Sequence, residues 1–207
     1  QKIPLESRMK VKEITLDMAN NMNLVAKMCF PKASIVTDRF HVVKLVTDAL
    51  QHIRIEQRWA EIKKENHAIK DAKVKGEKYV PEVLSNGDSP KQLLARSRYI
   101  ITKPKSDWTT NQEQRAKLLF KLYPNIEKGY NHSMGFRNIY KLASSNDGKE
   151  KMEHWIEKTK TLTFDHFNTA ANSIKNHLET ILNFFNNRNT NANAESFNSK
   201  IKLFRAN

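Results

Sequence analysis

The sequence predicts a chain that begins as an α/β unit and continues as a long helical region. Two short runs, "MKVKEITLD" and "ASIVTD", have the apolar and β-branched character of strands, and "MANNMNLVAKMCF" between them has the spacing of a helix. A strand, a helix and a second strand in this order typically form a parallel pair. Two parallel strands alone are not a stable sheet, so we expect this pair to be an incomplete part of a larger core.

From Phe40 onward the pattern becomes helical. Val42, Val46, Ala49 and Ile53 recur at helical spacing, and the predicted helix continues past Trp59 into a charged segment. Glycines and prolines predict a loop over residues 73–90. Further helices are expected at 89–101, 110–123, 125–143, 148–160, 166–187 and from Glu195, with capping residues at Ser89 and, as a capping box, at Thr110 and Glu113. No strand is expected between 40 and 190.

The composition favours a polyanionic partner. The chain has 207 residues and a formal net charge of +14. Lys and Arg displace counterions from a phosphate backbone, so DNA is the expected partner. No apolar stretch reaches the roughly 18 residues that a membrane span needs. The single cysteine, Cys29, fits a reducing cytosol and excludes a Cys-based zinc site.

Three acids lie where predicted elements begin or end. Asp17 and Asp38 each end a strand, and Glu195 begins a helix. Carboxylates at the carboxyl ends of parallel strands can hold Mg²⁺, which prefers oxygen ligands. Each acid also has a purely structural interpretation, because Asp17 and Asp38 could cap the helices that follow them and Glu195 could interact with a helix dipole.

Other candidate residues have equally simple alternatives. His41, in "DRFH", has no second histidine at ligand spacing, and a lone histidine on a helix is usually structural. A run of lysines could follow a phosphate backbone or could be a solvated helix face. Its members are Lys63, Lys64, Lys70, Lys73, Lys75 and Lys78.

"LDMANNM…FPKASIVTDRFHVVKLVTDAL", followed far downstream by "NTNANAESFNSKIKLFRAN", resembles DDE transposases of the bacterial ISL-three insertion-sequence type. The pieces D-M, F-P-x-A, V-x-D-R-F-H-V and N-x-x-A-E-x-x-N-x-x-I-K occur in the family's order and cover nearly the whole chain. The resemblance implies an RNase H-like core with a helical insertion. It also implies metal-dependent DNA cleavage and strand transfer in the bacterial cytoplasm.

The resemblance assigns roles to the acids. It implies that Asp17 and Glu195 are catalytic and hold two Mg²⁺ or Mn²⁺ ions together with a further aspartate. Asp38, Arg39 and His41 match an element that supports the site in related transposases, and Asp38 stays open as the rival second aspartate. The implied arrangement is a partial core over 1–50, an insertion over 51–165 and a return to the core over 166–207.

The sequence departs from the family pattern before Asp17, where no aspartate occurs. We therefore expect a fragment whose isolated chain is inactive, derived from a parent that is the active enzyme and a homo-oligomer. The alternative is a non-catalytic helical DNA-binding or assembly domain.

Overall fold

The computed structural model describes residues 3–188, 190 and 192–206, and it divides the chain into two compact units. The first unit comprises Gln1–Leu45, Phe136–Thr163 and Asn168–Asn207. The second comprises Val46–Gly135 and Phe164–Phe167. None of the helices in the described part of the chain has the length and apolar character needed to cross a membrane.

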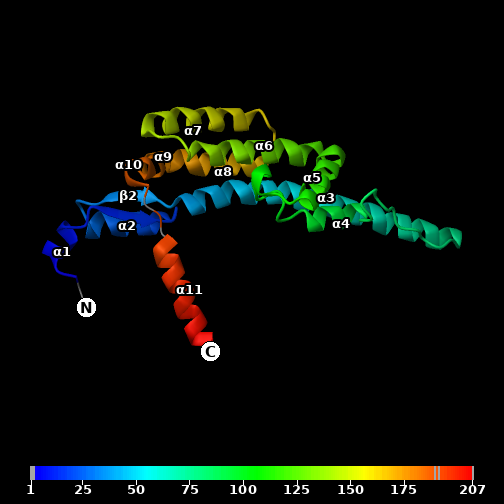
Figure 1. The fold of residues 1–207 in the computed structure, drawn as a ribbon, viewed down its shortest axis with the longest axis horizontal. Helices are drawn as coiled ribbons and strands as arrows, with labels where there is room; N and C mark the ends of the chain where they lie inside the picture. Colours follow the sequence, from blue (N-terminus) through cyan, green and yellow to red (C-terminus); the bar gives the residue numbers. More distant parts are fainter. Residues whose placement is uncertain (1–2, 189, 191, 207) are drawn as a thin grey trace. The chain divides into compact units, whose positions relative to one another are not determined.

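The first unit contains the predicted parallel strand pair. Strand β1 (Glu13–Leu16) pairs in parallel with β2 (Ser34–Thr37), and helix α2 (Asn20–Cys29) connects them (Figure 1). The register joins Glu13 to Ser34 and Leu16 to Thr37. The predicted first strand was too long, because its first residue, Met9, instead ends helix α1 (Leu5–Met9).

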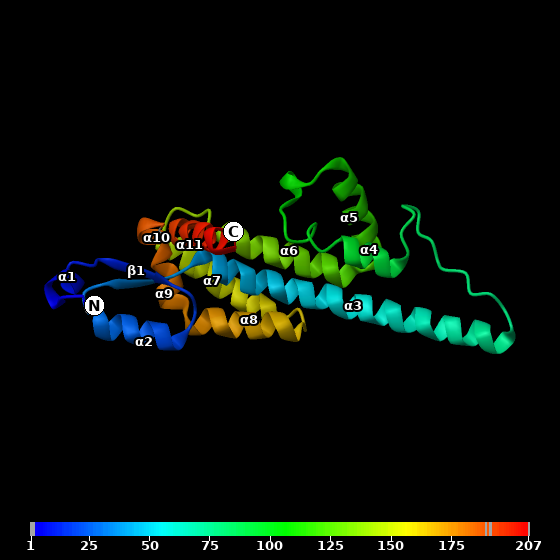
Figure 2. The same cartoon turned by 90° about the horizontal axis from the view of Figure 1, so that it is seen from below.

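Helices from the end of the chain complete this unit around β2. Helices α7 (Ser145–Lys160), α9 (Leu178–Leu182) and α10 (Phe184–Asn187) pack together, and α9 packs on β2 (Figure 2). Two hydrogen bonds fix the contact. The amide of Asn183 donates to the carbonyl of Ile35 at 2.8 Å, and the hydroxyls of Thr37 and Thr180 lie 2.7 Å apart. The last three residues of β2 are buried in succession, so both of its faces are covered.

The single helix predicted over 166–187 is wrong in detail, because the structure divides it. Helix α8 (Asp165–Asn176) ends before His177, whose backbone leaves the helical region at φ −111° and ψ 14°. Helices α9 and α10 then follow as separate short segments. The break at His177 separates α8 from α9, and α9 packs on β2.

A glycine permits the close packing of α7 on α10. A Cβ atom at Gly148 would lie 2.7 Å from Cε2 and 2.8 Å from Cζ of Phe185. Real Cβ atoms do not approach a ring this closely, so only glycine fits here without movement of Phe185.

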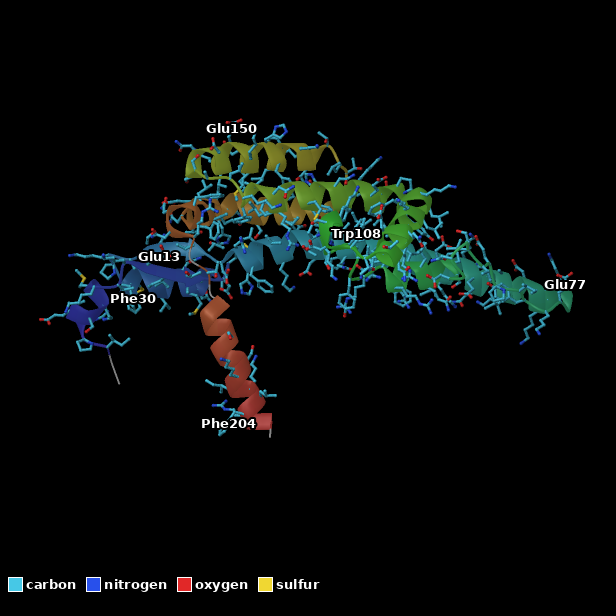
Figure 3. All side chains as sticks on the ribbon, in the orientation of Figure 1. Glu13, Phe30, Glu77, Trp108, Glu150 and Phe204 are labelled. Atoms are coloured by element: carbon cyan, nitrogen blue, oxygen red, sulfur yellow. The ribbon has the colours of Figure 1, made fainter. Side chains whose placement is uncertain are left out.

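The second unit is helical. It contains most of the long helix α3 (Arg39–Lys75), together with α4 (Pro90–Arg96), the short 3₁₀ turn η1 (Lys105–Asp107), α5 (Thr110–Leu122) and most of α6 (Pro124–Ile139). Trp108, which Figure 3 labels, packs against Phe120 and Tyr130 and donates from its indole nitrogen to the carbonyl of Ile100 at 2.9 Å. This aromatic cluster joins α5 and α6 to the preceding loop.

Helix starts were predicted with mixed success. Ser89 and Pro90 begin α4 as predicted, with a capping box that uses Gln92. The capping box predicted at Thr110 and Glu113 is wrong by one residue, because the structure forms it between Thr109 and Gln112. The last predicted helix is confirmed as α11 (Ala192–Ala206), which begins before Glu195.

Candidate functional site

Asp17 and Asp38 follow the two parallel strands at equivalent positions. The register pairs Leu16 with Thr37, and the backbone nitrogen of Asp38 donates to the carbonyl of Leu16 at 2.7 Å. Both acids therefore stand at the carboxyl edge of the sheet. In open parallel sheets this is the edge at which ligands bind.

The two carboxylates have different surroundings. Asp38 is only 1% exposed, and its Oδ1 accepts a hydrogen bond from the backbone nitrogen of Phe40 at 3.0 Å. This confirms that Asp38 caps helix α3. Asp17 is exposed, and its Oδ1 accepts from the backbone nitrogen of Ala19 at 3.0 Å, directly before α2. Asp17 thus forms a turn and keeps access to solvent.

A cavity of about 370 Å³ lies beside the start of α3 within the first unit. Its wall includes Asp38, Arg39 and Phe40 from α3 and Arg137, Tyr140 and Lys141 from the end of α6. The three cations outnumber the one carboxylate, and all three cationic side chains are exposed. The cavity is therefore positively charged and open to an anionic group.

Two buried polar atoms in this wall have no hydrogen-bond partner among the described residues. They are Oδ2 of Asp38 and the hydroxyl oxygen of Tyr140. Buried polar groups are almost always paired, so each orphan needs a physical explanation. Burial raises the pKa of Tyr140 far above its ordinary value, with the Asp38 carboxylate contributing in the same direction and Arg39 opposing. The hydroxyl of Tyr140 is therefore a permanent hydrogen-bond donor near neutral pH.

Aromatic packing holds the Tyr140 side of the wall in place. The ring of Tyr140 lies edge-on to Phe184 at 5.3 Å and parallel to Phe185 at 6.0 Å between centroids. The guanidinium of Arg39 lies over the Phe184 ring at 5.6 Å. Arg188, which has a left-handed backbone with φ 56°, donates to the carbonyls of Tyr140 and Leu142. These contacts order the wall before any ligand arrives.

The structure gives less detail for the remaining predicted site residues. Glu195 lies in helix α11, but its side chain falls outside the described residues. His41 is half-buried in the first turn of α3, with its ring edge-on to Phe40 at 5.4 Å. No cluster of three or more His, Cys, Asp or Glu side chains that could hold a metal ion occurs in the described part of the chain.

The predicted DNA-binding lysines are all exposed. Five of them lie on α3, and Lys78 lies in the loop that follows. They occupy more than one face of the helix. Lys63, Lys70 and Lys73 align with the exposed Trp59 at alternating four- and three-residue steps, with Asn66 completing the row. Lys64 lies on another face, 3.8 Å from Glu61 and 3.7 Å from Glu82.

The sequence patterns did not predict Arg137, Tyr140 and Lys141 as site residues. Their only signal was an Arg and a Lys four residues apart on either side of a tyrosine near a helix end, which is common on helix surfaces. Their proximity to Asp38 depends on tertiary packing between segments about 100 positions apart, which local patterns do not report.

Comparison with known proteins agrees with the order of motifs along the chain. A family model described as "Transposase", built on DDE transposases of the ISL-three type, matches residues 1–207. No curated protein and no solved structure matches the chain. With the family model covering every residue, the chain belongs to the ISL-three family of DDE transposases.

Proposed function

We propose that this chain supplies two of the three catalytic carboxylates of a DNA transposase, Asp17 and Glu195, within an RNase H-like core. The reaction is metal-dependent phosphodiester cleavage followed by strand transfer of an insertion sequence. The observation that carries the proposal is the position of Asp17 directly after β1 in a parallel β–α–β unit. Family membership supplies the type of reaction.

The surroundings of the two aspartates favour Asp17 over Asp38 as the metal ligand. A bound Mg²⁺ keeps several water molecules, so its ligand needs access to solvent and substrate. Asp17 has that access, whereas Asp38 is 1% exposed and already caps α3. Asp38 then supports the edge of the sheet next to Asp17.

The donor chemistry at this edge fits a magnesium or manganese ion. The Asp17 carboxylate offers the hard oxygen that these ions prefer. When bound, a pair of such ions lowers the pKa of a bound water and stabilises charge on the attacking and leaving oxygens. A full site needs three carboxylates, and this chain offers Asp17 and Glu195, so we expect the isolated chain not to catalyse strand transfer.

DNA contact through the row formed by Trp59, Lys63, Asn66, Lys70 and Lys73 follows from its charge. The lysines can contact successive phosphates, and such contacts position DNA without reading its sequence. Three acids lie within residues 59–73: Glu61 and Glu65 pair with Lys64 and Lys91, and Asp71 is exposed next to Lys70 in the sequence. This row also supports the second candidate function, a non-catalytic DNA-binding or assembly domain, which needs no metal.

Substitution in the complete transposase separates the two candidates. We expect Asp17→Asn and Glu195→Gln each to abolish strand transfer of labelled element ends in Mg²⁺ and Mn²⁺ while DNA binding in EDTA stays unchanged. Asp165→Asn, at an exposed carboxylate that begins α8, is the matched control and should retain activity. Normal strand transfer by Asp17→Asn would reject Asp17 as a ligand, and loss of activity by Asp38→Asn alone would transfer the role to Asp38.

A further inference from the structure

We propose that the cavity beside the start of α3 binds one unpaired nucleotide of a DNA strand. The inference rests on the proposed action on DNA, but it concerns a site separate from the Asp17 carboxylate and needs no metal. Four features of the wall carry it: the cations, an exposed aromatic ring, an orphaned donor and an orphaned acceptor.

The cationic side chains would bind the phosphate group of the nucleotide. Arg137 and Lys141 are four residues apart at the end of α6 and are both exposed, so their charged groups can reach the cavity and solvent. Arg39 joins them from α3, held over the ring of Phe184. The Tyr140 hydroxyl, buried and unpaired among the described residues, is a donor that a phosphate oxygen would satisfy.

The exposed ring of Phe40 would stack on the base of the nucleotide. Phe40 lines the cavity and is 56% exposed, although it is a large apolar side chain in the first turn of a long helix. Every nucleobase has a face that stacks on such a ring, independently of sequence. Because the side chain of Phe40 is exposed, rotation about its own bonds can open the wall toward Asp38.

The orphaned acceptor accounts for the preference for an unpaired base. Oδ2 of Asp38 is buried without a partner among the described residues, and it can only accept a hydrogen bond. All four bases carry N–H groups on their Watson–Crick edges, and an unpaired base presents this whole edge to Asp38. A paired base keeps at most one amino N–H, which lies in a groove, and a paired thymine keeps none. The site therefore favours an unpaired base whose phosphate contacts the cations.

The size of the cavity agrees with this occupant. A volume of about 370 Å³ lies at the small end of the range for sites that bind small ligands, which is about 300–1,000 Å³. The ordered wall around Tyr140 reduces the entropy lost when the nucleotide binds.

The test measures equilibrium binding of the 207-residue chain to fluorescent DNA hairpins in EDTA. Three hairpins differ only in one strand end: a single unpaired cytidine nucleotide, an abasic nucleotide at the same place, or a fully paired end. We expect the unpaired cytidine to bind about tenfold more tightly than the abasic end, as loss of one stacked base predicts. The free mononucleotide dCMP is a competitor and should compete only at far higher concentration than the hairpin.

Variants locate the effect in the cavity. Phe40→Leu and Asp38→Asn should remove the preference for cytidine over the abasic end, and Asn retains the helix cap. Tyr140→Phe and Arg137→Ala should weaken binding of the unpaired and abasic ends alike. Lys149→Ala, an exposed lysine on α7, is the control and should bind as the parent does. Circular dichroism checks that each variant is folded.

Each outcome decides the proposal. Equal binding of the cytidine and abasic ends, or a preference that survives Phe40→Leu, would overturn it. Competition by dCMP at the hairpin's own concentration would assign the cavity to free nucleotides instead. Because binding is measured without metal, strand transfer that persists in Asp17→Asn would defeat the catalytic proposal and leave this one standing.

Discussion

Substitution of Gly148 by alanine tests the packing of α7 on α10 most directly. The new Cβ would lie 2.7 Å from Cε2 and 2.8 Å from Cζ of Phe185, and 3.2 Å from Cδ2. Phe185 is 6% exposed and stacks parallel to Tyr140, so its ring cannot turn into solvent without breaking that contact. We therefore expect the helix or the ring to shift.

The expected magnitude is a balance of opposing terms. Replacing a helical glycine by alanine stabilises a helix by about 1 kcal/mol. Overpacking a core costs about 1–3 kcal/mol, and a disturbed aromatic pair costs about 0.5–1.5 kcal/mol more. Together these terms predict that Gly148→Ala lowers the free energy of unfolding by about 0.5–3.5 kcal/mol.

Urea denaturation followed by circular dichroism measures this change, and Gly135→Ala is the matched control. Gly135 is also helical, but a Cβ added there would meet no atom within 4 Å. The control should gain up to about 1 kcal/mol from helix propensity alone. If Gly148→Ala is stabilised as much as Gly135→Ala, then α7 and α10 do not pack as the structure shows and the reasoning is refuted.

Three further predictions concern buried polar groups. Burial is the chief cause of the raised pKa values of Tyr140 and Tyr123, so as pH rises these tyrosines ionise in the unfolded chain before they ionise in the folded one. The free energy of unfolding should therefore fall as pH rises above about 10, and it should fall less steeply in Tyr140→Phe. Asp88→Asn should cost about 1–3 kcal/mol in urea denaturation, because Asp88 is 1% exposed and is contacted by two arginines; no loss would show that these pairs are not formed. Thr180→Val should cost about 1–3 kcal/mol by leaving the Thr37 hydroxyl buried without its partner, whereas Thr180→Ser should be near neutral.

Local sequence patterns predicted the strand pair and most helices, because the spacing of apolar residues within a short segment indicates its secondary structure. The run "ASIVTD" became β2 within one residue at each end, since continuous β-branched residues suit a strand covered on both faces. The failures are also local in origin. Two adjacent threonines lie at the start of α5, and the pattern alone did not decide that Thr109, rather than Thr110, is the cap.

The candidate site was only partly accessible from sequence. Position at a strand end identified Asp17 and Asp38, but only burial distinguishes the capping aspartate from the exposed one. The cavity wall could not be predicted, because Arg137 and Tyr140 reach Asp38 through packing of distant segments. The insertion boundaries expected at 51 and 165 stay predictions.

The hydrogen bonds that complete β2 also constrain when this protein can fold. The partners Asn183 and Ile35 are 148 positions apart in the chain. A ribosome adding about 5–20 residues per second needs roughly 7–30 s to cross that interval. Throughout that time the newly made strands lack the helix that covers them, and their apolar residues are available to chaperones or to other nascent chains. The two strands are thus synthesised well before the helix that stabilises them, so slowed translation of the intervening helices should increase misfolding of these residues.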